Sequence, residues 1–420
     1  MPRPLAVFAT KLAGAGLALL LNVTVSRTIG IHEAGMFFIG LSLVTMLYAL
    51  ARFGMGYAIY RCVAELSETG RQDALADTVR AALGRVGLLS LPAGTLMALA
   101  SPWLAGLLFG DAGKAPVLAV LAATIPVYCL GSVLSEVLRG RRQPLQYALF
   151  ENVLIKALAI PLVIGLGTAF GLVGAGLGFL AANAGALVFA AIAVVRVLKP
   201  IAGVPAPCDR PALYRAARYF AVVSIAGVTT QWLGPLVVGS LLSPADAALF
   251  FTAYRTAAVL DFVVISIVAV AGPAFVGAFA RSGASGVGAM ARPAALRALA
   301  GALALAMPLW LSARFIMGLY GEAFAAGETV LRILIAFQVL NAPLGVFTAA
   351  AIARKQERRM AGAALVAVSA SALLIAAGTG LYGLTGAACA SGLALVLQNG
   401  LVLLFLKIPM AEKRWVPQRS

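Results

Sequence analysis

Long runs of apolar residues alternate with short polar segments along this chain. Residues 87–110, GLLSLPAGTLMALASPWLAGLLFG, form one such run and contain no charged side chain. A helix needs about 20 residues to cross the hydrocarbon core of a bilayer, so this run is long enough to span it. The strands of a membrane barrel would instead alternate apolar and polar residues over segments of about 10 residues. The pattern therefore predicts an all-α polytopic membrane protein.

The apolar runs predict about twelve membrane spans, an even number that would place both termini on one side of the bilayer. The predicted spans are residues 5–29, 34–58, 83–108, 115–138, 144–167, 171–195, 219–241, 247–272, 297–319, 326–351, 361–380 and 382–406. Longer connectors are expected at 59–82, 196–218 and 273–296. The first mixes acids and bases at helical spacing, which predicts an interfacial helix. The second contains KPIAGVPAPCDRP, whose prolines oppose regular helix and predict a linker.

Three segments of the first half recur in the second half at nearly the same offset. The matching pairs are HEAGMFF (32–38) with ADAALFF (245–251), RRQ (141–143) with RKQ (354–356), and FGLVGAG (170–176) with YGLTGAA (382–388). They predict two parallel six-helix repeats around a central cavity, an arrangement found in transporters. We expect a first half at 1–200, a cytoplasmic linker at 201–218, and a second half at 219–420 that includes a cytoplasmic tail.

Composition and charge support a membrane protein and suggest its orientation. The 420 residues are 62% hydrophobic and 11% charged, whereas soluble domains are roughly 25% charged. Most of the 32 Lys and Arg lie at the N-terminus, in alternate loops and in the C-terminal tail. By the positive-inside rule, both termini are then cytoplasmic. Most of these bases lie in short loops between apolar runs, where they orient the protein, so the net charge of +17 does not indicate nucleic-acid binding.

Charged residues within spans are candidates for function, because they need a watery cavity or a buried partner. Lys156 and Asp261 lie about midway along their spans, and a pair between them would be a candidate gate between the halves. The alternative for each is a structural ion pair between helices. Asp261 and Glu151 are candidates for proton or sodium coupling. The other predicted cavity residues are Arg255, Lys11, Arg52 and Arg332.

The intramembrane bases outnumber the acids at depth, which would suit an anionic substrate in a passage of low dielectric constant. Arg314, Lys11, Arg52 and Arg332 are close enough to span ends to reach an interface instead. Amides within the spans offer hydrogen bonds either to sugar hydroxyls or between helices, and they are Asn22, Asn152, Gln231, Gln338 and Asn341.

The only histidine, His32, stands beside Glu33 in the repeated segment HEAGMFF. Its repeat partner is alanine and no second histidine exists, so we expect neither metal binding nor catalysis there. Glu33 recurs as Asp246, which indicates an acid that favours the start of a helix. The four cysteines have no metal-ligand spacing, and no nucleotide-binding GxxxxGK[ST] loop is present. We expect no cofactor, and a transporter rather than an enzyme.

Residues 25–66, VSRTIGIHEAGMFFIGLSLVTMLYALARFGMGYAIYRCVAEL, resemble the start of Wzx-type oligosaccharide and polysaccharide flippases. These belong to the multidrug/oligosaccharidyl-lipid/polysaccharide exporter superfamily. The residues that carry the resemblance are Arg27, Gly30, the segment 33–37 and Arg61. Residues 237–257 and 382–394 resemble landmarks of the family's second half. Many relatives carry charges in helix 7, whereas TTQWLGPLVVG (229–239) has none.

The resemblance implies a flippase of the bacterial inner membrane that acts by alternating access. Its substrate would be an undecaprenyl-pyrophosphate-linked oligosaccharide repeat unit, used for O-antigen, capsule or exopolysaccharide. Membrane lipids, a polysaccharide polymerase and other assembly proteins would be its partners. An ion-coupled multidrug or small-molecule exporter of the same superfamily is the alternative. A membrane-embedded polymerase, ligase or glycosyltransferase would need larger outer loops than this sequence predicts.

Overall fold

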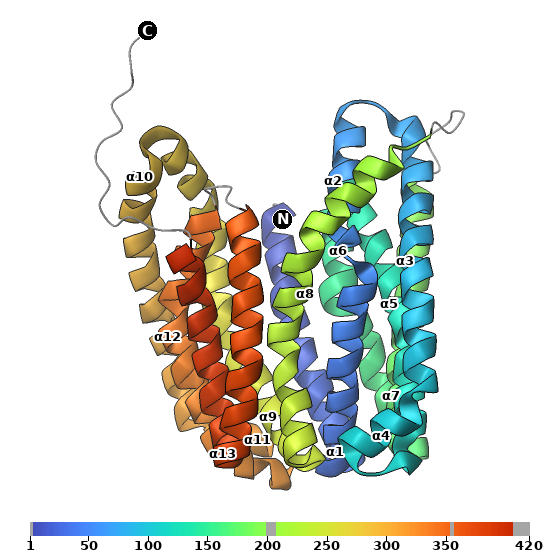
Figure 1. Ribbon diagram of the computed structural model, residues 1–420, viewed down its shortest axis with the longest axis vertical. Coiled ribbons are helices and arrows are strands. Elements are labelled where there is room, and N and C mark those ends of the chain that lie inside the picture. Colours follow the sequence, from blue (N-terminus) through green and yellow to red (C-terminus); the bar gives the residue numbers. More distant parts are fainter. Residues whose placement is uncertain (1–2, 199–206, 353–356, 406–420) are drawn as a thin grey trace. The chain divides into compact units, whose positions relative to one another are not determined.

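The computed structural model describes residues 3–198, 207–352 and 357–405, and every element within these ranges is helical (Figure 1). Nine of its segments are long and apolar enough to cross a membrane. Three of them, Ala9–Arg52, Pro144–Leu198 and Val366–Leu401, are each interrupted at a glycine with non-helical backbone angles. Counting these three as two spans each gives the 12-helix fold. The predicted all-α, multi-pass membrane architecture is confirmed.

The helices form two compact units, Met1–Ala248 and Leu249–Ser420, which we call unit 1 and unit 2. Helix α9 (Pro244–Ala257) begins in unit 1 and ends in unit 2. The other elements of unit 1 are α1 (Arg3–Arg52), α2 (Met55–Glu68), η1 (Gln72–Ala74), α3 (Leu75–Leu99), α4 (Ser101–Phe109), η2 (Ala112–Lys114), α5 (Ala115–Gly140), α6 (Pro144–Ala148), η3 (Leu149–Leu154), α7 (Ile155–Leu198) and α8 (Arg210–Leu241). Those of unit 2 are η4 (Ala258–Leu260), α10 (Asp261–Leu311), α11 (Ala313–Gly318), η5 (Glu322–Gly327), α12 (Glu328–Ile352) and α13 (Glu357–Phe405).

Helix α5 lies at the centre of unit 1 and contacts α1, α2, α3 and α7. Its residues 131–138 are all buried, as expected of a helix that is covered on every side. Helix α8 packs against α1 and α2, and the Tyr57 and Phe220 rings lie 3.9 Å apart between their centroids. Thus α8, the first helix of the second sequence repeat, is part of unit 1. The predicted division into 1–200 and 219–420 describes the repeats and stays a prediction.

The backbone breaks of the two repeats match. Gly171 has φ 57° and ψ −137°, and Gly383, its partner in the sequence repeat, has φ 60° and ψ −143°. Side chains rarely tolerate this region, whereas glycine adopts it readily. Each glycine lets the chain end one span and begin the next without a loop. The duplication predicted from FGLVGAG and YGLTGAA therefore preserves a backbone conformation.

The repeat of HEAGMFF also begins at a break. Gly30 (φ 78°, ψ 170°) interrupts α1 just before this segment. At the equivalent point α8 ends and α9 starts, where the Ser243 hydroxyl accepts a hydrogen bond from the Asp246 amide at 3.1 Å. The same hydroxyl donates to the Asp246 carboxylate at 2.6 Å, which completes a helix N-cap. Asp246 thus stabilises a helix start, as predicted for the repeated acid.

The predicted connectors at 59–82 and 196–218 need correction. Residues 59–82 are not one interfacial helix: α2 ends at Glu68, and α3 already begins at Leu75. Leu75, Val79, Ala82 and Val86 form a buried stripe at helical spacing, which extends the third span into a charged segment. Residues 210–218 of the predicted linker are helical, because α8 begins at Arg210. The segment 199–206 lies outside the described residues.

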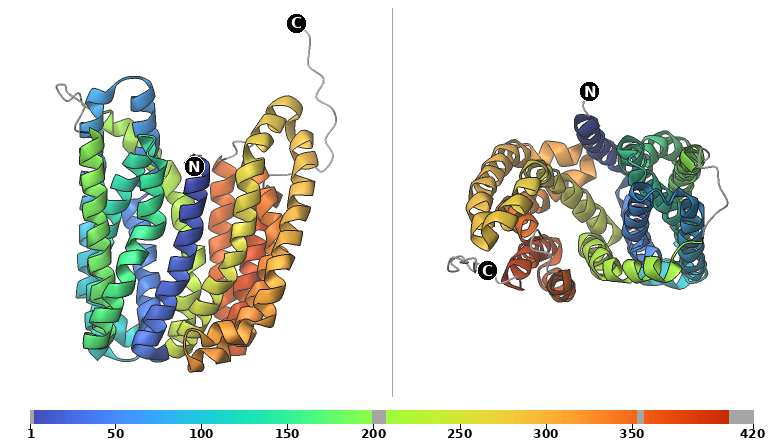
Figure 2. Two further views of the ribbon diagram at one scale, coloured as in Figure 1. Left: turned by 180° about the vertical axis from the view of Figure 1, so that it is seen from behind. Right: turned by 90° about the horizontal axis from the view of Figure 1, so that it is seen from above.

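The connector expected at 273–296 is also helical. It belongs to α10, which turns back on itself in both side views (Figures 1 and 2). Residues from both arms, including Phe275, Ala278, Ala294 and Ala298, share one core with α12. The fold-back follows from these contacts, since a straight helix rises about 1.5 Å per residue and would carry the two arms apart. Small side chains here allow close helix packing.

Candidate functional site

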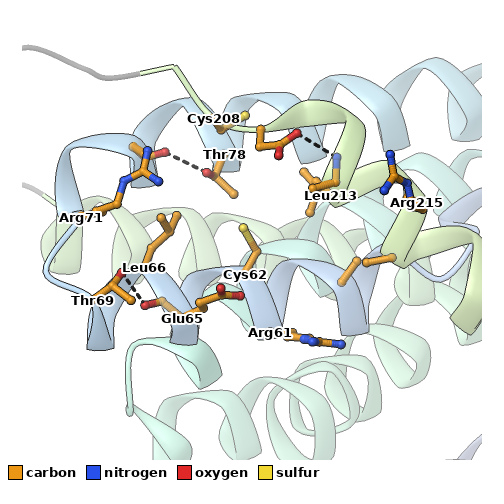
Figure 3. Close-up of a pocket in the computed structure, with 15 residues that line it drawn as sticks. Arg61, Cys62, Glu65, Leu66, Thr69, Arg71, Thr78, Cys208, Leu213 and Arg215 are labelled. Carbon is orange, nitrogen blue, oxygen red and sulfur yellow. Dashed lines mark hydrogen bonds between the residues drawn. The ribbon is translucent and has the colours of Figure 1, made fainter.

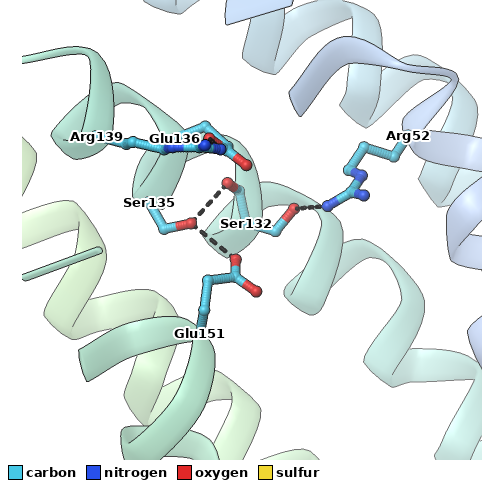
Figure 4. Close-up of polar contacts among 6 residues, drawn as sticks. All are labelled: Arg52, Ser132, Ser135, Glu136, Arg139 and Glu151. Carbon is cyan, nitrogen blue, oxygen red and sulfur yellow. Dashed lines mark hydrogen bonds and ion pairs between the residues drawn. The ribbon is translucent and has the colours of Figure 1, made fainter. Parts of the chain in front are cut away.

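A cluster of charged and hydroxyl side chains lies inside unit 1, where α1, α5 and η3 meet (Figure 4). We call it the charged cluster. It consists of Arg52, Ser132, Ser135, Glu136, Arg139 and Glu151. Helix α5 supplies four of these at the spacing i, i+3, i+4 and i+7, which places them on one helical face. None of these four was predicted as a site residue from the sequence, although this spacing would have grouped them.

Arg52 is brought to the cluster by the end of α1. The helix breaks immediately afterwards, at Phe53 and Gly54, both of which have positive φ. The Arg52 guanidinium then donates to the Ser132 hydroxyl on α5 at 3.1 Å. Arg52 also interacts electrostatically with Glu136 and Glu151. The structure therefore directs Arg52 towards α5.

Glu136 is 9% exposed and forms an ion pair with Arg139 at 3.4 Å. The Arg139 guanidinium in turn lies over two tyrosine rings, 4.3 Å from the centroid of Tyr60 and 5.1 Å from that of Tyr147. Cation–π contacts of this kind offset part of the cost of desolvating a guanidinium. The pair is thus held by α2 and α6 as well as by α5.

The Ser135 hydroxyl connects α5 to η3. Its oxygen lies 2.9 Å from the Ser132 carbonyl oxygen and 2.9 Å from the Glu151 carboxyl oxygen. A hydroxyl has one hydrogen to donate, so it cannot fully satisfy both acceptors. Ser135 therefore shares its hydrogen between its own helix and the Glu151 carboxylate.

Lys156 lies one turn beyond Glu151, after the π-helical turn η3. Its ammonium donates to the backbone carbonyls of Glu151 at 3.0 Å and Asn152 at 2.9 Å. A π-helical turn shifts the backbone register, and such turns are frequent at functional sites. The Lys156 ammonium therefore lies against η3, and its hydrogen-bond partners are the backbone carbonyls of that turn. Its predicted pairing with Asp261 concerns both units and stays a prediction.

The polar side chains of unit 2 are mostly uncharged amides and hydroxyls. We call Asn341, Thr348 and Asn399 the amide network. The Asn399 amide donates to the Asn341 side-chain oxygen at 2.7 Å, and Thr348 donates to the Asn399 side-chain oxygen at 3.1 Å. Asp261 begins α10, and its carboxylate is hydrogen-bonded to the Gln338 side chain. These bonds join α12 to α13 and α10 to α12.

The remaining predicted cavity residues have varied surroundings. Arg332 pairs with Glu328 at 2.7 Å, donates to the Trp310 carbonyl at 3.3 Å, and lies 4.5 Å from the centroid of the Trp310 ring. Arg255 is half-buried, with its guanidinium 5.3 Å from the Phe251 ring centroid. Lys11 and Arg314 are exposed. Thus only Arg52 and Glu151 of the predicted cavity residues enter the charged cluster, with Lys156 adjacent to it.

The repeated acid of the first half has a different role from Asp246. The Glu33 carboxylate lies 3.5 Å from the Lys114 ammonium of η2, so it links two helix junctions in unit 1. His32 beside it is exposed. Within the described residues, no three His, Cys, Asp or Glu side chains come together as a metal site would require.

Comparison with known proteins identifies the family. The family described as "Polysaccharide biosynthesis protein" matches residues 5–279. A search of curated proteins gives no match. The fold resembles a multidrug resistance MATE family transporter of the MOP superfamily in its inward-facing conformation (TM-score 0.77, 16% identity, covering 96% of this chain and 98% of that one). It also resembles the lipid II flippase MurJ in an inward closed conformation (TM-score 0.75, 13% identity, covering 96% and 89%).

A third similar structure is a MOP superfamily transporter from Pyrococcus furiosus (TM-score 0.64, 17% identity, covering 96% and 93%). At these identities the structures establish a shared fold. The family match extends over more than half of the sequence. The chain belongs to the polysaccharide biosynthesis protein family and has the fold of MOP superfamily transporters.

Proposed function

We propose that the protein flips a lipid-linked oligosaccharide across the bacterial inner membrane, with both termini in the cytoplasm. The substrate would be a repeat unit on undecaprenyl pyrophosphate, and a polysaccharide polymerase would consume the product. The observation that carries the proposal is a partly buried charged cluster in a member of a polysaccharide biosynthesis family. Sugar polymers are assembled from such units, and a pyrophosphate needs cationic partners away from water.

Arg52 is the residue of the cluster best suited to attract the pyrophosphate. Its one side-chain hydrogen bond to another described residue goes to the neutral Ser132 hydroxyl at 3.1 Å, whereas Arg139 is already paired with Glu136. A guanidinium presents several donors in a plane and matches phosphate oxygens in a bidentate manner. Lys156, in the first turn of α7, adds a second positive charge next to the cluster. Arg52 would thus bind substrate while Arg139 maintains the cluster.

Glu151 is our candidate for coupling transport to a proton gradient. Its carboxylate accepts a hydrogen bond from the Ser135 hydroxyl at 2.9 Å. A proton bound to Glu151 would remove a negative charge near Arg52 and Glu136, which would strengthen the attraction of the cluster for an anion. Proton binding and substrate binding would therefore influence each other through one site. Asp261 is the corresponding candidate in unit 2.

Complementation of a bacterial strain that lacks its own oligosaccharide flippase tests this function. The wild-type chain should restore surface polysaccharide, and Glu151→Gln should fail to do so at equal membrane abundance. Glu322→Gln, at an exposed position in η5, is the matched control and should complement fully. If the wild-type chain leaves polysaccharide absent but raises drug resistance, the flippase proposal is wrong and the exporter alternative holds.

A further inference from the structure

A cavity of about 500 Å³ lies in unit 1 between α2, α3 and the start of α8, apart from the charged cluster (Figure 3). Three arginines line it: Arg61 on α2, Arg71 before η1, and Arg215 on α8. The remaining walls are largely apolar, with side chains such as Leu66 and Leu213. The space is therefore large enough for a small ligand and carries its charge at a few defined points.

The three guanidinium groups have no hydrogen bond or ion pair with another described residue. Three neighbouring arginines outside the cavity differ in this respect. Arg141 donates to Ser67 at 3.2 Å, Arg142 pairs with Glu68 at 3.0 Å, and Arg210 pairs with Asp77 at 3.1 Å. The arginines that line the cavity are thus available to a ligand.

The acids in the cavity wall do not cancel this charge. Asp209 is used by the fold, because its carboxylate accepts a hydrogen bond from the Ala212 amide at 3.0 Å and caps α8. Glu65 is exposed and is the one other carboxylate in the wall. Three cationic side chains against two anionic ones leave an excess of positive charge.

The wall is held in place by hydrogen bonds that do not involve the three arginines. The Asp77 carboxylate of α3 accepts from the Cys208 amide at 2.9 Å and from Arg210. The Tyr214 hydroxyl donates to the Ala81 carbonyl at 3.4 Å. Burial raises the pKa of the Cys62 and Cys208 thiols, so both remain neutral and do not oppose an anion. The cavity is therefore preformed.

We propose that this cavity is a second ligand site, which binds the phosphate or diphosphate group of an amphipathic ligand. Guanidinium groups favour phosphate because they offer paired donors in one plane. The apolar wall would contact the adjoining part of the ligand. A soluble phosphorylated molecule and an anionic phospholipid headgroup both carry this chemistry. The inference does not depend on the proposed flippase function.

Binding of inorganic pyrophosphate to the purified full-length protein tests the site directly. We expect pyrophosphate to raise the unfolding temperature in a saturable manner. Arg61→Gln and Arg215→Gln should each weaken its affinity by about tenfold, the scale of one charged hydrogen bond. Glu65→Gln should strengthen binding a few-fold, because it removes a repelling charge. Arg80→Gln, at an exposed position of α3 outside the cavity, should leave the affinity unchanged.

A second arm identifies a lipid as the source of the phosphate. The protein is placed in nanodiscs of pure phosphatidylcholine or of phosphatidylcholine with phosphatidylglycerol, and its unfolding temperature is compared. Stabilisation by phosphatidylglycerol that disappears in Arg61→Gln and Arg215→Gln supports the site with a lipid ligand, even if pyrophosphate does not bind. Equal behaviour of wild type and both arginine variants in both arms overturns the proposal. Weaker binding by Glu65→Gln overturns it as well. None of these readouts measures transport, so failure here is separate from failure of the flippase proposal.

Discussion

Units 1 and 2 each contain a glycine break of the same backbone conformation, at Gly171 and Gly383, but they differ in the chemistry of their polar groups. In unit 1, Arg52, Glu136, Arg139 and Glu151 form a charged cluster beside Lys156. In unit 2, the amide network joins α12 to α13 through neutral hydrogen bonds, and Asp261 bonds to an amide. At the offset of the repeats, Arg52 corresponds to Ile265 and Glu136 to Ala349. Neither Arg52 nor Glu136 therefore has a charged counterpart in the second repeat.

This difference shows what a duplication preserves. The glycine breaks are retained, because the chain must turn between adjacent spans in both repeats. Buried charges are costly and persist where they have a use, whereas amide bonds between helices contribute modestly to stability. We therefore expect substitutions in the charged cluster of unit 1 to lower transport. Substitutions in the amide network of unit 2 should chiefly lower the stability of the protein. The following experiments test this expectation.

The largest effect is expected at Arg52. Arg52→Met removes the guanidinium that contacts Ser132, and we expect transport to fall by at least about tenfold, the effect of losing one charged hydrogen bond to the substrate. Surface polysaccharide in the complemented flippase-deficient strain measures it. Arg314→Met, at an exposed position in unit 2, is the control and should keep full activity. If both variants transported equally well, Arg52 would have no special role in transport.

A smaller effect is expected when Lys156 loses its charge. In Lys156→Met, the carbonyls of Glu151 and Asn152 lose their ammonium donor, and a buried polar group without a partner costs about 1–3 kcal/mol. The unfolding temperature of the purified protein should fall. Lys156→Arg, which keeps a charged donor, should recover part of the loss. A stable Lys156→Met protein would show that these bonds contribute little.

The two glycine breaks should respond alike, since they share one backbone conformation. Gly171→Ala and Gly383→Ala should each destabilise the protein by roughly 1–2 kcal/mol, because a side chain is unfavourable at these angles. Gly165→Ala and Gly380→Ala lie in helical positions with open space around them and serve as matched controls. Thermal unfolding measures all four. A loss in only one repeat would show that the breaks are not equivalent.

The smallest effect is expected in the amide network. Asn341→Leu and Asn399→Leu each remove one side of their 2.7 Å hydrogen bond. A double-mutant cycle should give a coupling of about 0.6 kcal/mol, the average for hydrogen bonds between membrane helices. Transport by the double variant should stay near wild type. A strong transport defect at unchanged stability would assign this network to substrate binding instead.

Much of the architecture followed from apolar periodicity, because a span must be long, uncharged and helical. Errors arose where a charged segment had one buried face, as at Leu75, Val79 and Val86 in α3. The helical core at 273–296 was missed for a related reason, since alanines at close helix contacts give a weak hydropathy signal. The repeat was found from three short matches, and Gly171 and Gly383 gave it a structural meaning.

The candidate site was predicted only in part. Depth within a span selected Lys156 and Glu151, because charge in an apolar run is conspicuous. Glu136 lies at the end of a predicted span and was not predicted, yet it is 9% exposed and lies near Arg52 of α1 and Glu151 of η3. Asp261 and Lys156 were ranked by depth alone, and depth does not identify a partner. The structure showed that Lys156 binds backbone carbonyls of its own helix.

By itself, the sequence determined the membrane location, the number of spans and the duplication. These are set by local properties: the length of apolar runs, and glycine at positions where the backbone must turn. Only the tertiary structure decided that Arg52, Ser135, Glu136 and Glu151 meet, because they come from α1, α5 and η3. It also decided that α8 packs within unit 1, which leaves Arg61 and Arg215 around one cavity. Such groupings depend on how helices distant in sequence pack, and no local pattern encodes them.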